Sequence, residues 1–198
     1  MIKFDHYIKF YDRYFSRFRG TPAVIVEIGV GHGGSLQMWK HYFGQNAIIY
    51  GIDKDDRKEV EEDRIKTIQG NQNDEKFLDS FLKEVPEIDV LIDDCGHEPH
   101  EQIFTFKKLF PFVKSDGVYA CEDTFHSYSQ KHGGGFRKHG SAIEFFKEIV
   151  ENINQDIGEN EISYRNNIYK YIKGISFQAN LVVVENYSYE QKGATQIG

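Results

Sequence analysis

Two acidic pairs stand where strands of this chain are expected to end. Asp93-Asp94 and Glu122-Asp123 each follow a short apolar run. The carboxyl ends of parallel strands share one edge of a sheet, so up to four carboxylates converge there if the two strands are neighbours. Converging carboxylates repel one another, and a hard divalent cation bound by their oxygen atoms relieves that repulsion. The pairs therefore predict a cation site, with magnesium as the first choice and calcium or manganese as alternatives.

A histidine follows the first acidic pair closely. His97 comes three residues after Asp94, on a turn that contains Cys95 and Gly96. Its imidazole suits a general base, a metal ligand or a plain turn residue, and the residues alone do not separate these roles. An aspartate after a strand also often caps the next turn, which leaves a purely structural role open for Asp93. Cys95 without a second closely spaced pair is a poor zinc pattern.

A glycine-rich turn joins the first expected strand to a helix. Gly29, Gly31 and Gly34 match the spacing of the dinucleotide-binding fingerprint, and Asp53 follows at the end of the second expected strand. Such glycines let a ligand approach the backbone at a helix N-terminus. The pattern fits NAD, S-adenosylmethionine or a turn without a ligand. Glu27 favours S-adenosylmethionine, because a carboxylate there repels a pyrophosphate and attracts the ammonium of a methionine moiety.

Strand and helix patterns alternate in an order that positions these residues. Helical spacing predicts helices over residues 73–85 and 102–109 and a third from Ser141, where Glu144 would reach back to the serine in a capping box. We therefore expect an α/β fold with a doubly wound, mostly parallel seven-stranded sheet and an antiparallel C-terminal hairpin. The apolar runs that predict its strands are residues 23–28, 47–52, 65–68, 88–92, 117–121, 170–177 and 180–185.

The chain is expected to form one domain with an additional helix. Residues 1–20 predict an amphipathic aromatic helix, residues 21–188 the domain and residues 189–198 a polar tail. A lid or dimer contact made by the helix, and hence a homo-oligomer, is left open. A net charge of −7 argues against a nucleic-acid partner, and no apolar run approaches the ~20 residues of a membrane span. Two cysteines and no signal-peptide pattern indicate the cytoplasm.

Longer motifs give the chain a family resemblance. Residues 27–31 and 50–53 resemble the first two motifs of class I S-adenosylmethionine-dependent methyltransferases. Residues 92–97, together with Leu109-Phe110-Pro111, Gly117-Val118-Tyr119 and Glu122-Asp123, resemble the metal-dependent macrolide sugar O-methyltransferases of the mycinamicin and tylosin type. The wider group includes the cephalosporin hydroxylase and rhamnosyl O-methyltransferase families, and the likeness spans about residues 22 to 186.

The resemblance implies a Rossmann-like methyltransferase fold and methylation of a sugar hydroxyl with S-adenosylmethionine and Mg²⁺ or another hard divalent cation. The sugar would belong to a glycan, a capsule or a secondary-metabolite precursor. The resemblance places the metal on Asp94, Glu122 and Asp123 and the general base at His97. The cofactor contacts are expected from Glu27, Gly29, Gly31, Ser35, Asp53, Asn71, Gln72 and Asp93.

The chain departs from the family pattern at two places, and two other functions remain possible interpretations of the sequence. The usual Asp-Gly-Ser-His appears here as residues 94–97, Asp-Cys-Gly-His, and the usual Gly-Asp-Gln as residues 70–72, Gly-Asn-Gln. The second departure weakens a cofactor contact at Asn71. The alternatives are an NAD-dependent oxidoreductase acting on a sugar and a methyltransferase-like subunit that binds a partner without catalysis.

Overall fold

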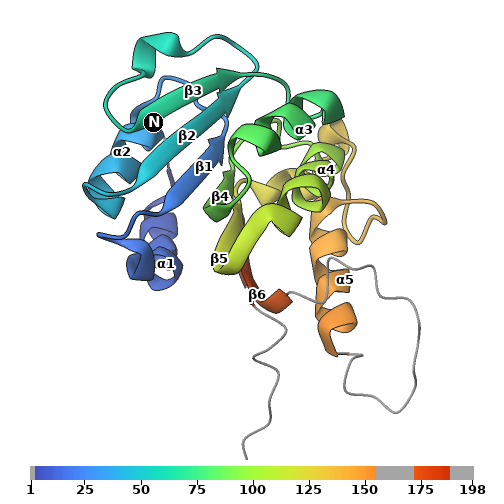
Figure 1. Cartoon of the computed structure of the whole chain (residues 1–198). Helices are drawn as coiled ribbons and strands as arrows, with labels where there is room; N and C mark the ends of the chain where they lie inside the picture. Colours follow the sequence, from blue (N-terminus) through green and yellow to red (C-terminus); the bar gives the residue numbers. More distant parts are fainter. Residues whose placement is uncertain (1–2, 155–171, 188–198) are drawn as a thin grey trace, which may run out of the picture.

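The computed structural model describes residues 3–154 and 172–187, and the expected polar tail lies outside them. Seven strands form one sheet in the order β3-β2-β1-β4-β5-β7-β6 (Figure 1). Because the order reverses between β1 and β4, a crevice is expected at their carboxyl ends. The strands are β1 (Val24–Ile28), β2 (Ile48–Asp53), β3 (Ile65–Gln69), β4 (Ile88–Asp93), β5 (Val113–Cys121), β6 (Ile172–Gln178) and β7 (Leu181–Asn186).

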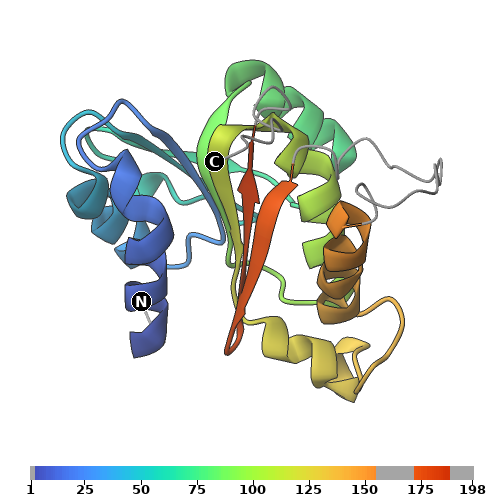
Figure 2. The same ribbon diagram turned by 90° about the horizontal axis from the view of Figure 1, so that it is seen from below.

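The strand directions agree with the expected sheet. Strands β1 to β5 pair in parallel, whereas β7 pairs antiparallel with both β5 and β6. The C-terminal hairpin therefore completes the sheet beyond β5, with β7 inside it and β6 at its edge (Figure 2). The doubly wound, mostly parallel seven-stranded sheet with an antiparallel hairpin is confirmed.

Helices cover both faces of the sheet and bury a separate apolar cluster on each (Figure 1). Helices α1 (Asp5–Phe15) and α2 (Gly34–Phe43) pack on one face, where Ile25, Ile49 and Val90 point. Helices α3 (Glu75–Glu84), α4 (Pro99–Leu109) and α5 (Ala142–Asn154) pack on the other. Strands buried on both faces explain the continuous apolar runs of the sequence.

The expected N-terminal helix is present and packs through its aromatic residues. Phe15 is fully buried, and its ring centroid lies 5.0 Å from that of Tyr11 and 5.8 Å from that of Trp39 in α2. Ile8 is 46% exposed, so the buried apolar face of α1 is narrower than the spacing of its apolar residues predicts. Large buried aromatic rings supply most of the apolar area at such a contact, so α1 is part of the core.

Helix α5 begins where the capping pattern indicated, but with half of the expected box. The Ser141 hydroxyl accepts a hydrogen bond from the Glu144 amide at 3.4 Å. The Glu144 carboxylate accepts from Lys147 Nζ at 2.7 Å instead of reaching back to Ser141, because one turn along the helix offers a charged partner. In the part of the chain that the structure describes, no helix is long and apolar enough to cross a bilayer.

We expect Phe15→Ala to lower the free energy of unfolding by about 3–5 kcal/mol, because it leaves a cavity among buried aromatic rings. Ile8→Ala, on the exposed face of the same helix, should change it by less than about 0.5 kcal/mol. Urea unfolding followed by circular dichroism measures both. Equal losses for the two variants would contradict the buried position of Phe15.

Candidate active site

The glycine turn brings the ends of β1 and β4 into contact. Gly29 has φ +98°, and its amide donates to the Ile52 carbonyl at 2.8 Å. A Cβ atom on Gly29 would lie 2.2 Å from the carbonyl oxygen of Asp94, so no larger residue fits without moving the backbone. Helix α2 begins directly after this turn, at Gly34, and aims its N-terminus at the crevice.

Asp53 holds the glycine turn from the end of β2. Its carboxylate accepts hydrogen bonds from the amides of Val30 at 3.0 Å, Gly31 at 3.1 Å and Asp55 at 3.0 Å. Burial acts to raise the pKa of Asp53, but these amides and Arg57 outweigh it and hold the pKa below its ordinary value. Asp53 is therefore a carboxylate whose oxygen atoms face the crevice.

Two adjoining hollows lie over this turn. The larger, about 570 Å³, is lined by residues that include Gly29, Gly31, Ser35, Asp53 and Asp94. Its volume lies in the range of small-molecule and cofactor sites. The smaller, about 290 Å³, shares Asp53 and Cys95 with it and is also lined by Asn71 and Gln72. Most of the expected cofactor contacts thus surround one continuous region.

Asn71 and Gln72 differ in what their side chains do there. The side-chain Oδ1 of Asn71 accepts from the Asn73 backbone amide at 2.9 Å, which is a local turn contact. The Gln72 amide group donates to the Thr105 hydroxyl at 3.1 Å. Its buried Oε1 has no partner among the described residues and is available to a ligand. Gln72 is therefore the better placed of the two, while both contacts stay predictions.

Asp93 lies under the site, away from the hollows. It is fully buried, and the Tyr119 hydroxyl donates to its Oδ2 at 3.1 Å, while Oδ1 has no partner among the described residues. Burial raises the pKa of Asp93 to about 8, against the effect of the Tyr119 hydroxyl and the nearby Cys95 amide, which lower it. Its position favours the bracing role that the sequence left open.

Three carboxylates converge where β1, β4 and β5 end, and a lysine lies among them. Lys3 Nζ is 2.5 Å from Glu122 Oε1, 2.6 Å from Asp94 Oδ2 and 3.3 Å from Glu27 Oε1. Burial acts to lower the pKa of Lys3, but the attraction of Glu27, Glu122 and Asp94 raises it above its ordinary value. Burial in turn raises the pKa of each of the three carboxyl groups, and Lys3 opposes that rise.

Helix α1 supplies two more partners to the same edge. The Tyr11 hydroxyl donates to Glu122 Oε1, the oxygen that Lys3 also contacts. The Tyr7 hydroxyl lies 3.1 Å from Asp123 Oδ1 and 2.8 Å from the Asn180 carbonyl. Burial raises the pKa of both tyrosines, so their hydroxyls stay protonated and donate. The aromatic helix therefore forms one wall of the site.

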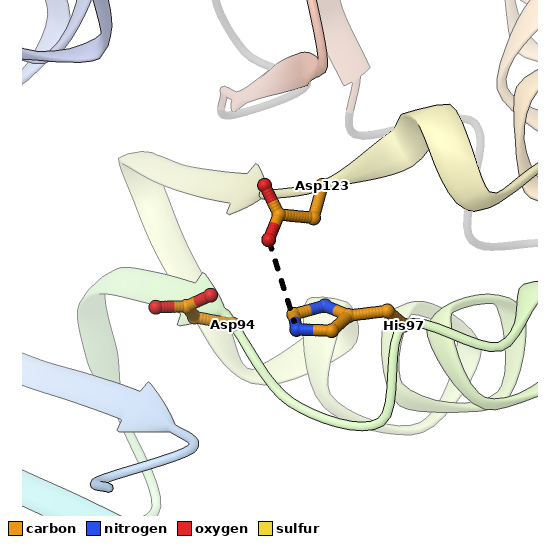
Figure 3. Close-up of side chains that lie close together, drawn as sticks. All are labelled: Asp94, His97 and Asp123. Carbon is orange, nitrogen blue, oxygen red and sulfur yellow. Dashed lines mark ion pairs between the residues drawn. The ribbon is translucent and has the colours of Figure 1, made fainter. Parts of the chain in front are cut away.

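His97 faces the acidic edge from the loop before α4 (Figure 3). Its Nε2 lies 3.7 Å from Asp123 Oδ2, and its backbone is left-handed with φ +53°. Its ring stacks on His126, with centroids 5.4 Å apart and planes 9° apart. Burial and the neighbouring rings of His132 and His97 hold the pKa of His126 below its ordinary value.

The potential metal ligands form two groups that share Asp94. Among the described residues, ligand atoms lie within 4.8 Å of one another in the group Asp94, His97, Asp123 and in the group Glu27, Asp94, Glu122. The three expected ligands, Asp94, Glu122 and Asp123, thus border one region but are divided between the groups. Carboxylate oxygens suit a hard divalent cation, so the donor set fits the expected metal. The exact ligand set stays a prediction.

The buried carboxylate Glu27 tests the fit of the expected cofactor. Its Oε2 has no hydrogen-bond partner among the described residues, although Ser35 and Trp39 lie close enough to lower its pKa. An unpaired buried carboxylate oxygen is costly, and a cationic group beside it removes that cost. Glu27 together with the glycine turn therefore suits a ligand with an ammonium group better than one with a pyrophosphate.

The sequence reasoning missed Lys3, Tyr7 and Tyr11 as site residues. Tyr7 and Tyr11 are four residues apart on one face of α1, whereas Lys3 precedes the helix, and the spacing by itself predicts only an apolar face. Tyrosine carries an apolar ring and a polar hydroxyl, so burial of the ring can deliver the hydroxyl to a buried acceptor. The available signal was a lysine four residues before the first of two tyrosines that are themselves four residues apart.

Comparisons with known proteins agree with this geometry. A family model described as a methyltransferase domain matches residues 26–124, half of the chain. The chain belongs to this family. Among curated relatives, the mycinamicin VI 2''-O-methyltransferase of Micromonospora griseorubida is 33% identical, over 92% of this chain and 48% of that protein. The demethylmacrocin O-methyltransferase of Streptomyces fradiae is 31% identical, over 88% of this chain and 47% of that protein.

Solved methyltransferase structures have the same fold as this methyltransferase domain. The MycE methyltransferase from the mycinamycin biosynthetic pathway, in complex with Mg and SAH, superposes with a TM-score of 0.88 at 32% identity, over 96% of this chain and 52% of that one. Its complex with Mg, SAH and mycinamycin VI gives a TM-score of 0.87. The Rossmann-like methyltransferase fold is confirmed. The chain spans about half the length of the relatives it matches.

We expect Gly29→Ala to destabilise this methyltransferase domain more than Gly31→Ala, by about 1–3 kcal/mol. Both residues have positive φ, but a Cβ on Gly29 meets the Asp94 carbonyl, whereas one on Gly31 meets nothing within 4 Å. Urea unfolding of the two variants compares them directly. A larger loss for Gly31→Ala would contradict the close approach of β1 and β4.

We expect the free energy of unfolding to fall with rising pH because of Asp93. Its pKa is about 8 in the folded chain against an ordinary 3.8, so between these values the unfolded chain releases a proton that the folded chain retains. Asp93→Asn removes this term, so the stability of the variant relative to the wild type should increase from pH 5 to pH 8, by at most about 4 kcal/mol.

Urea unfolding at several pH values in the presence of a chelator measures this difference. Asp63→Asn is the control, because the Asp63 side chain is 86% exposed. A difference between Asp93→Asn and wild type that is constant with pH would contradict a protonated Asp93.

Proposed function

We propose that this chain is the catalytic domain of an S-adenosylmethionine- and divalent-metal-dependent O-methyltransferase that acts on a sugar hydroxyl. The observation that carries the proposal is the meeting of a glycine turn, a buried carboxylate with one unpaired oxygen, and an acidic edge with His97 around one crevice. The names of the curated relatives support the reaction class, since they include sugar 2'- and 3'-O-methyltransferases. We place the enzyme in the cytoplasm.

The cofactor would be held by residues from three strand ends. Glu27 would bind its ammonium, the glycine turn at Gly29 and Gly31 would let its amino-acid end approach the backbone, and Asp53 would accept from its ribose hydroxyls. Ser35 lies in the first turn of α2 on the wall of the same hollow. Gln72 faces the smaller hollow, where its free Oε1 would accept from the base.

The reaction needs a hydroxyl that is deprotonated and directed at the methyl donor. When bound, S-adenosylmethionine supplies the electrophilic methyl group, and the divalent cation lowers the pKa of a coordinated sugar hydroxyl. Asp94, Glu122 and Asp123 would hold that cation. His97 presents Nε2 to this edge, so Nε2 is the atom that accepts the hydroxyl proton, and the stack on His126 fixes the direction of the ring.

The sugar itself would enter beside His97. The segment after β5 carries exposed aromatic side chains, with Phe125 42% and Tyr128 50% exposed. The Phe125 ring centroid lies 4.2 Å from that of His126, which in turn stacks on His97. Flat apolar rings next to the base offer a platform for the apolar face of a sugar. The platform favours a glycosylated small molecule over a charged acceptor.

Calorimetric titration with S-adenosylhomocysteine, beside NAD and with either Mg²⁺ or a chelator, tests the cofactor. We expect binding of S-adenosylhomocysteine alone, with a Kd of about 1 μM or about −8 kcal/mol. Glu27, a carboxylate just before the glycine turn, disfavours the pyrophosphate of NAD. Binding of NAD alone would contradict the proposal and favour an oxidoreductase.

Methyl transfer to a panel of glycosylated acceptors, with Mg²⁺ or with chelator, tests the reaction in the same series. Asp94→Asn keeps the size of the side chain and should retain S-adenosylhomocysteine binding while losing turnover, because a ligand of the cation is removed. Asp63→Asn changes the same charge at an exposed position and should retain both. Full turnover of Asp94→Asn with chelator present would exclude a metal-dependent reaction.

A further inference from the structure

The N-terminal segment inserts a positive charge of its own into the acidic edge. The Lys3 side chain is only 3% exposed, and its Nζ lies 2.6 Å from Asp94 Oδ2 and 2.5 Å from Glu122 Oε1. A hard divalent cation bound by these same two oxygens would lie about 2.0–2.6 Å from each of them. The ammonium and the metal ion would then be nearly superimposed. The two cations therefore exclude each other at these oxygens.

We propose that Lys3 is a resident cation of this site that a divalent metal ion must displace, so that the N-terminal segment sets the metal affinity of the domain. The inference rests on the proposed function, which assigns Asp94 and Glu122 to the metal. It adds to that function a residue outside the matched methyltransferase region, residues 26–124.

The charge balance allows displacement. Lys3 brings one positive charge to three carboxylates, and Glu27 still has an unpaired oxygen beside it. A divalent ion brings two charges and compensates the repulsion among Asp94, Glu122 and Asp123 more completely. Lys3 has the opposing advantage of being tethered, which gives it a high effective concentration at the site. Removal of the lysine should consequently raise the apparent affinity for the metal.

The backbone around Lys3 allows it to leave while the helix stays in place. Phe4 is extended, with φ −66° and ψ 137°, and is 45% exposed, and α1 begins only at Asp5. The helix is held independently of Lys3. The Tyr7 hydroxyl contacts the Asn180 carbonyl at 2.8 Å, and His6 Nε2 contacts the Ala179 carbonyl at 2.7 Å. Rotation before Asp5 is therefore sufficient to withdraw the ammonium.

The same movement would open the cofactor side of the site. Lys3 Nζ also contacts Glu27 Oε1 at 3.3 Å, and Glu27 is fully buried and does not line the large hollow. Withdrawal of Lys3 frees this carboxylate for the ammonium of a ligand. A single lysine thus occupies positions that the proposed function assigns to two different cationic groups.

The first experiment is a calorimetric titration of the protein with Mg²⁺ in the absence of S-adenosylhomocysteine, so that no ligand ammonium competes with Lys3 at Glu27, for wild type and Lys3→Met. Methionine retains most of the unbranched apolar stem but carries no charge. We expect Lys3→Met to bind Mg²⁺ about tenfold more tightly, within the usual range of coupling between competing ligands. Lys9→Met removes the same charge from an exposed position in α1 and should leave the affinity unchanged. Unchanged or weaker binding by Lys3→Met would overturn the inference.

The second experiment needs no variant. Lys3 is protonated and buried, so it should react slowly with an amine-acylating reagent, and exposed Lys9 provides an internal reference for mass spectrometry. Saturating Mg²⁺ should increase the acylation of Lys3 relative to Lys9 at least fivefold. Continued protection of Lys3 while Mg²⁺ binds would show that the two cations coexist and would overturn the inference.

Failure of the inference and failure of the proposed function give different results. If wild type and Lys3→Met bind Mg²⁺ equally and Asp94→Asn abolishes binding in both, the metal site stands and the role of Lys3 is rejected. If neither wild type nor Lys3→Met binds Mg²⁺, with or without S-adenosylhomocysteine, both proposals are rejected. Tighter binding by Lys3→Met that is lost on Asp94→Asn supports both.

Discussion

Repulsion among carboxylates at the carboxyl edge of the sheet is the constraint on which the site depends. Glu27, Asp94 and Glu122 bring their oxygens within 4.8 Å of one another, and Glu27 and Glu122 are almost fully buried. Water cannot screen such groups, so protein cations and hydroxyls must compensate them. Lys3 and Tyr11 supply that compensation from the N-terminal segment. The N-terminal segment therefore stabilises the acidic edge, because the packing of α1 on the sheet brings Tyr11 and Lys3 to Glu122.

The sheet creates this constraint through its strand order. Strands β1 and β4 are neighbours at the point where the order reverses, and Gly29 permits the Asp94 backbone to approach. Strand β5 pairs with β4. Glu122 and Asp123 directly follow β5, so they lie at the same edge as Asp94. The cofactor hollow and the acidic edge are thus two sides of one crevice, and Asp94 belongs to both. A common residue offers a direct route for coupling between cofactor and metal.

Much of the fold was predictable because its signals are local. Each strand is a short apolar run, and the acidic residues at Asp93 and Glu122 follow such runs directly, so their placement at one edge requires only that the strands be parallel. The capping box predicted at Ser141 was confirmed only in part. The Glu144 carboxylate could accept from a backbone amide or from Lys147, and in the structure it accepts from the charged Lys147. Local sequence limits such choices without deciding them.

By itself, the sequence determined which segments form strands, the glycine turn at Gly29, the position of Asp53 and the acidic residues of the edge. Each of these features depends on neighbours within a few residues. Only the tertiary structure decided which groups meet. Lys3 is separated by 91 residues from Asp94 and by 119 from Glu122, and no periodicity relates positions so far apart. The stack of His97 on His126 and the division of the expected ligands between two groups arise in the same way. Such contacts depend on the packing of whole elements, since the direction of a side chain is fixed only when its helix or loop is docked.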